Sequence, residues 1–96
     1  MKMLMIVCPE ARQKEIRELI TRLNVTSYSE IPNVLGAGKT GKHFDTHIFP
    51  GKSVLVFTVI PTAKKKEIVA ELKAYQTTLM PGEGLRVFSL NVESTF

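Results

Sequence analysis

The stretch KSVLVFTVI, residues 52–60, is the strongest strand signal in the chain, because β-branched and aromatic residues fill it. A run of this composition is typical of a β-strand. Successive side chains of a strand point to opposite faces, and here both alternating sets are apolar. The stretch therefore predicts a strand inside a sheet, with apolar side chains on both of its faces.

Three further segments complete the predicted sheet. Residues 2–8 form a short continuous apolar run, typical of a buried central strand. Residues 25–35 are rich in β-branched and aromatic residues but contain Pro32, which cannot donate to a strand ladder, so this strand should lie at an edge or carry a bulge. Residues 85–92 form the last strand, after the turn cluster Pro81-Gly82-Glu83-Gly84.

Two helices are predicted between these strands, the first from Pro9 to Asn24 and the second from Pro61. Each has an apolar stripe at helical spacing, formed by Ile16, Leu19, Ile20 and Leu23 in the first and by Ile68, Leu72, Tyr75 and Leu79 in the second. Three lysines, at 64–66, occupy the first turn of the second helix, where the helix dipole disfavours cations. They form either a solvated face or a site for an anion or a partner.

The element order strand, helix, strand, strand, helix, strand is that of the ferredoxin-like βαββαβ fold of the α+β class. Right-handed crossovers place both helices on one face of a four-stranded antiparallel sheet. We expect a single domain over residues 1–96, with the strands at 2–8 and 52–60 in the middle of the sheet.

The other face of the sheet has no predicted cover. Both central strands have apolar side chains on that face too, and monomers seldom expose such a patch. The sheets should therefore pack against each other in an oligomer. We expect aspartate at Val54 or Val56, whichever faces away from the helices, to break that oligomer.

Composition narrows the classes of function. The chain has a formal charge of +4 and a pI near 9.4, which suits an anionic partner or solubility alone. Cys8 is the only cysteine, so no disulfide forms within the chain, and the absence of a signal sequence or membrane span predicts a cytoplasmic protein. Aromatic residues make up 7% and no basic aromatic face appears, so we expect no nucleic-acid partner. No nucleophile lies in a catalytic context, and we expect no enzyme activity.

The glycine-rich segment at 36–51 holds four of the six glycines and both histidines. The spacing Gly36-x-Gly38-x-x-Gly41 resembles a dinucleotide fingerprint, but a strand follows where that motif requires a helix. Backbone N–H groups at such glycines can still bind phosphate, and Lys39 and Lys42 add positive charge. The alternative is a flexible hairpin loop.

The pattern His43-x-Asp45-x-His47 lies in the same segment. If the segment is extended, these three side chains share a side and could hold a divalent metal with an open coordination position. The alternative is that the histidines are ordinary solvent-exposed or hydrogen-bonding residues.

Four segments together resemble the PII-type signalling proteins and their PII-like relatives over nearly the whole chain: residues 3–7, residues 34–43, the strand that begins near Ser53 and Val54, and residues 82–93. The resemblance implies a homotrimer with inward-facing sheets and an adenine nucleotide bound in clefts between subunits. Carried over to this chain, it also implies a nucleotide or anion site formed by Gly36, Gly38, Lys39, Gly41, Gly82, Gly84 and Arg86. Arg86 stands where the family usually has lysine.

Two departures from the family pattern bear on function. The loop at 38–51 is shorter and has no tyrosine, so the modification known in classical members cannot occur there. The arginine-bearing C-terminal segment that classical members use for phosphates is absent, so classical ATP binding and 2-oxoglutarate sensing are not implied.

The resemblance thus implies a trimeric regulatory module whose loop 38–51 contacts a partner protein, such as a membrane transporter or an enzyme. The first alternative is a CutA-like protein that binds a divalent metal through His43, Asp45 and His47. A third option is an enzyme whose site is completed by the trimer.

Overall fold

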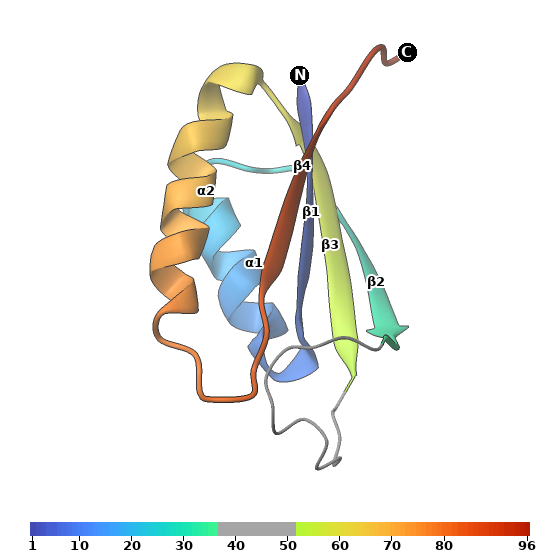
Figure 1. Ribbon diagram of the computed structural model, residues 1–96. Helices are drawn as coiled ribbons and strands as arrows, with labels where there is room; N and C mark the ends of the chain where they lie inside the picture. The colour runs from blue at the N-terminus through green and yellow to red at the C-terminus, as the bar shows by residue number, and fades with distance from the viewer. Residues whose placement is uncertain (37–51) are drawn as a thin grey trace.

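The computed structural model describes residues 1–36 and 52–96. The elements are β1 (Lys2–Pro9), the 3-10 turn η1 (Glu10–Arg12), α1 (Gln13–Arg22), β2 (Ser29–Val34), β3 (Ser53–Ile60), α2 (Thr62–Gln76) and β4 (Arg86–Asn91). The strands form one antiparallel sheet in the order β2-β3-β1-β4. Both helices lie on the same face of this sheet (Figure 1). The predicted ferredoxin-like fold is confirmed, and β1 and β3 are its central strands.

The core lies between the helices and one face of the sheet. Every second residue of the central strands points into it, and the fully buried side chains include Leu4, Ile6, Val54 and Val56. The helices contribute most of their predicted stripes, with Ile16, Leu19 and Ile20 buried on α1 and Ile68 and Leu72 on α2. Leu23 and Leu79 lie just past the helix ends and are partly buried against this core, as is Tyr75. Within the described ranges, neither helix is long and apolar enough to cross a membrane.

The opposite face of the sheet is apolar, and none of the described helices covers it (Figure 1). The strand register places nine apolar residues on it, which we call the open face: Met3, Met5, Val7, Ile31, Leu55, Phe57, Val59, Phe88 and Leu90. Phe88 is 52% exposed and Leu90 is 46% exposed. The predicted two-sided apolar character of the sheet is therefore confirmed.

The strand register corrects the positions at which we expected aspartate to break the oligomer. Val54 and Val56 both point toward the helices and are fully buried, so neither lies on the open face. Leu55 and Phe57 are the residues of β3 that face away. The sequence could not assign the faces, because both alternating sets in this strand are apolar.

The edge strand β2 is shorter than predicted and starts at Ser29 instead of residue 25. Asn24 has a φ of 68° just after α1, and the chain then crosses from the helix layer to the sheet. The prediction for Pro32 is confirmed, because β2 lies at an edge and its register shifts between Ile31 and Val34, where Asn33 has a φ of 58°.

Candidate functional site

Six of the ten predicted site residues lie outside the described residues, together with the loop 38–51. These are Gly38, Lys39, Gly41, His43, Asp45 and His47. Their proposed roles stay predictions. The structure describes the other four, Gly36, Gly82, Gly84 and Arg86.

The turn that carries Gly82 and Gly84 connects α2 to β4 (Figure 1). Gly82 has a φ of 92°, a conformation that residues with a Cβ rarely adopt. The N–H of Glu83 donates to the carbonyl of Met80 at 3.0 Å, and the N–H of Met80 donates to the Glu83 carboxylate at 2.9 Å. The turn therefore has a defined shape that depends on glycine at position 82.

Arg12 attaches this turn to the start of α1. Its Nε lies 3.2 and 3.1 Å from the two carboxylate oxygens of Glu83, and its Nη2 lies 3.1 Å from Oε1. Its Nη1 donates to Glu15 at 3.2 Å, and Glu15 accepts a further hydrogen bond from the Tyr75 hydroxyl. One polar cluster thus connects η1, α1, α2 and the glycine turn.

The charges of this cluster stabilise one another. The hydrogen bond from Arg12, followed by that from the Met80 N–H, lowers the pKa of Glu83. The hydrogen bond to Glu83 is in turn the main cause that raises the pKa of Arg12. Burial, and then the hydrogen bond to Glu15, raises the pKa of Tyr75 to about 12. Glu83 is therefore a carboxylate, neutralised by Arg12, in the middle of the glycine turn.

Arg86 follows the turn as the first residue of β4. It is exposed and lies opposite Val7, at the end of the open face nearest to the glycine turn. Among residues 1–36 and 52–96, no carboxylate lies within ion-pair distance of Arg86. No described carboxylate therefore competes with an anion for its guanidinium.

Gly36 lies at the same end of the sheet but at the other edge. It follows β2, whereas Arg86 begins β4, and both β3 and β1 lie between them. Three strand spacings amount to about 14 Å. A Cβ at Gly36 would meet no atom within 4 Å, so nothing in the described part of the chain requires glycine there. The structure therefore brings Gly82, Gly84 and Arg86 together, but it does not place Gly36 beside them.

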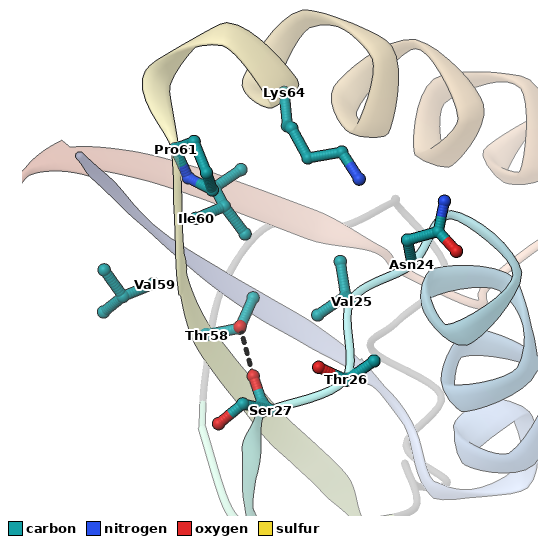
Figure 2. Close-up of a pocket in the computed structure, with 9 residues that line it drawn as sticks. All are labelled: Asn24, Val25, Thr26, Ser27, Thr58, Val59, Ile60, Pro61 and Lys64. Carbon is teal, nitrogen blue, oxygen red and sulfur yellow. Dashed lines mark hydrogen bonds between the residues drawn. The ribbon is translucent and has the colours of Figure 1, made fainter.

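A cleft of about 170 Å³ lies at the far end of the sheet, and the sequence did not predict it (Figure 2). Its walls are the segment after α1 and the end of β3 with the start of α2, and its lining residues are Asn24, Val25, Thr26, Ser27, Thr58, Val59, Ile60, Pro61 and Lys64. Thr58 donates its hydroxyl to the carbonyl of Ser27, and Lys64 donates its amine to the carbonyl of Leu23 at 3.0 Å. Of these residues the sequence analysis singled out only Lys64, as one of three lysines at a possible anion or partner site; it could not predict the cleft itself, which depends on where β2 begins.

The cleft exists because β3 extends beyond its neighbour. The ladder between β2 and β3 starts at the pair Ser29–Phe57, so residues 58–60 have no strand partner on that side. Along an antiparallel strand, one residue directs both its N–H and its C=O toward one neighbouring strand, and the next residue directs both toward the other side. At least one residue among 58–60 therefore presents backbone donors and acceptors to the cleft.

No group of three or more metal-ligating side chains occurs in the described parts of the chain. The predicted set His43, Asp45 and His47 lies in the segment that is not described, so the metal site stays a prediction.

The family model "Nitrogen regulatory protein P-II" matches residues 1–96. No match was found among the curated proteins. Of the solved structures, CPII, a nitrogen regulatory PII-like protein from Thiomonas intermedia K12 bound to ADP, AMP and bicarbonate, is 16% identical and has a TM-score of 0.70, over 99% of this chain and 94% of that one. A putative PII-like signaling protein from Thermus thermophilus is 19% identical with a TM-score of 0.61, over 95% and 84%. These findings give the CutA-like alternative no support.

Proposed function

The chain belongs to the nitrogen regulatory protein P-II family, and from this premise we propose that it is a homotrimeric regulatory protein that binds an adenine nucleotide between its subunits. In this proposal the chain acts as a single domain over residues 1–96, in the cytoplasm and not as an enzyme. Its loop 38–51 contacts a partner protein, such as a membrane transporter or an enzyme. Three solved CPII structures support the choice of ligand, because they contain ADP together with AMP, bicarbonate or acetate.

One observation supports placing the site between subunits. The glycine turn with Arg86 and the cleft near Lys64 lie at opposite ends and opposite edges of the sheet. Arg86 pairs with Val7, and Val59 in the cleft pairs with Met3, four residues away along β1. This is about 13 Å along the strand, and two strand spacings add about 10 Å across it. One nucleotide could reach both in the same chain only by laying its charged phosphates across the apolar open face. The two half-sites are therefore assigned to neighbouring subunits.

The glycine turn and Arg86 form the phosphate half of the proposed site. Arginine binds phosphate through two parallel hydrogen bonds, and glycines let backbone N–H groups approach closely. In this proposal Lys39 and the N–H groups of Gly38 and Gly41, which lie outside the described residues, complete this half.

The cleft forms the base half of the proposed site. It combines apolar walls at Val25 and Ile60 with backbone groups at the end of β3 that have no partner on β2. A nucleobase presents the same combination, an apolar ring face and an edge of donors and acceptors. Ligand sites typically combine apolar surface with a few fixed polar groups in this way.

The open face supplies the reason for assembly. Nine apolar side chains on one exposed sheet face are more than an isolated domain usually shows to water. Packing three such faces against each other removes them from water and brings the edges of neighbouring sheets together.

Calorimetric titration with ADP, AMP and ATP, with and without bicarbonate, tests the proposal. We expect ADP to bind, and Arg86→Ala to weaken it about ten- to a hundredfold, since a charge-assisted hydrogen bond contributes roughly 1.5–3 kcal/mol. Arg22→Ala is the matched control, because Arg22 is an exposed arginine at the other end of α1. If the unmutated protein binds no adenine nucleotide up to millimolar concentration, the proposed ligand is wrong.

A further inference from the structure

The glycine turn has a feature that its phosphate-binding role does not explain, namely a carboxylate between its two glycines. Glu83 stands directly between Gly82 and Gly84 and three residues before Arg86. A negative charge at that position would repel a bound phosphate, because three residues of chain span no more than about 10 Å. An anion site with this sequence therefore needs a compensating positive charge.

Arg12 supplies that charge from a different element. Three of its contacts to Glu83 are 3.1–3.2 Å long, and both carboxylate oxygens take part. The pair is partly buried, with the Arg12 and Glu83 side chains only 27% and 22% exposed. The carboxylate is thus held by the protein on the side of α1 and is not left free for the ligand side.

The shape of the turn does not depend on Arg12 alone. The Met80 N–H donates to Glu83 Oε1, the Glu83 N–H donates to the Met80 carbonyl, and Gln76 donates to the Leu85 carbonyl at 3.1 Å. A glutamine at position 83 could accept the bonds from Met80 and Arg12 through its amide oxygen. The charge of Glu83 and the fold of the turn can therefore be changed separately.

We propose that Arg12 is a positioning residue of the nucleotide site, which neutralises Glu83 and so makes the acidic glycine turn able to accept phosphate. This role presupposes the nucleotide site proposed above. Arg12 itself contacts no phosphate: it acts through Glu83.

The experiment compares Arg12→Gln, Glu83→Gln, the double variant and Arg12→Lys. Calorimetry measures the affinity of each for ADP and, as a probe without a base, for inorganic pyrophosphate, at low and at moderate salt. Arg22→Gln removes the same charge from the far end of α1 and is the control for net charge. Thermal melting of each variant reports whether it is folded.

We expect Arg12→Gln to weaken both ligands about three- to tenfold, since one negative charge is left uncompensated near the anion. The deficit should shrink as salt is added. Glu83→Gln should bind as well as the unmutated protein or slightly better, and adding it to Arg12→Gln should restore affinity. Arg12→Lys, which keeps the charge, should stay close to the unmutated protein and serves as the test if Arg12→Gln does not fold.

Several results would overturn this role. Equal losses in Arg12→Gln and Glu83→Gln would show that the pair only holds the turn in shape. Unchanged affinity in Arg12→Gln would show that neutralisation is irrelevant, and a loss that the double variant does not restore would make Arg12 a direct ligand. If the unmutated protein binds pyrophosphate but no adenine nucleotide, the proposed function fails while Arg12 is still tested with pyrophosphate. If it binds neither, both proposals fail.

Discussion

Replacing Phe88 by aspartate is the sharpest perturbation of the proposed assembly. Phe88 lies on the open face opposite Met5 and is 52% exposed in the single chain. Because the side chain is already half in water, the folded monomer should lose only about 1 kcal/mol. In an oligomer that buries the open face, the same residue would be fully enclosed.

The expected cost to assembly follows from two contributions. Losing the burial of half a phenylalanine removes about 1 kcal/mol per subunit. Enclosing an unpaired carboxylate in its place costs about 3–5 kcal/mol more. A total of about 4–6 kcal/mol per subunit corresponds to roughly a thousandfold weaker association, or more, for each subunit.

Sedimentation velocity at micromolar concentration measures the effect. We expect the unmutated protein to sediment as a trimer and Phe88→Asp as a folded monomer. Ser89→Asp is the matched control, because Ser89 is the exposed neighbour that pairs with Leu4, whose side chain faces the helices. A Phe88→Asp protein that remains trimeric would show that the open face is not the interface. An unmutated protein that is monomeric would show that the proposed trimer does not form.

Three further predictions concern the single chain. Gly82→Ala should cost about 1–2 kcal/mol in chemical unfolding, because a Cβ disfavours its φ of 92°, whereas Gly36→Ala should be nearly neutral; equal effects would contradict the assignment. The hydrogen bond from Arg17 lowers the pKa of Glu30, so the stability that Glu30 contributes is present above its ordinary pKa of 4.5 and lost as the pH falls through the lower folded pKa. The stability difference between the unmutated protein and Glu30→Gln should therefore vanish in acid, and a difference independent of pH would refute this cause. Burial, and then the charge of Glu30, raises the pKa of Cys8 to about 11, so iodoacetamide should alkylate Cys8 at about pH 8 only after denaturation, and fast labelling of the folded protein would contradict its burial.

The fold could be predicted because local patterns and topology agree in this chain. The apolar runs at residues 2–8 and 52–60 predicted the central strands, and Pro32 predicted a strand that lies at an edge or carries a bulge. The pattern could not assign the faces of β3, because Val54 and Leu55 are equally apolar and only the register separates core from open face.

The site could be predicted only in part, because it depends on distances across the sheet. Gly82 and Arg86 are close in sequence, so their proximity followed from the turn. Gly36 was expected near them, but the strand order places it at the opposite edge. The cleft beside Lys64 and the pair Arg12–Glu83 are each formed by segments far apart in the chain. Local sequence motifs do not predict such contacts.

Complementation between two defective subunits tests most directly whether ADP binds between neighbouring copies. Arg86→Ala damages the phosphate half, and Ser27→Trp fills the cleft that Ser27 lines. We predict that neither variant alone binds ADP with the affinity of the unmutated protein. After unfolding and refolding the two together, each mixed trimer should regain one site of full affinity, formed by the intact Arg86 of one subunit and the intact cleft of the next. Mixtures that bind no better than the separate variants, although they form mixed trimers, would contradict a site shared between subunits.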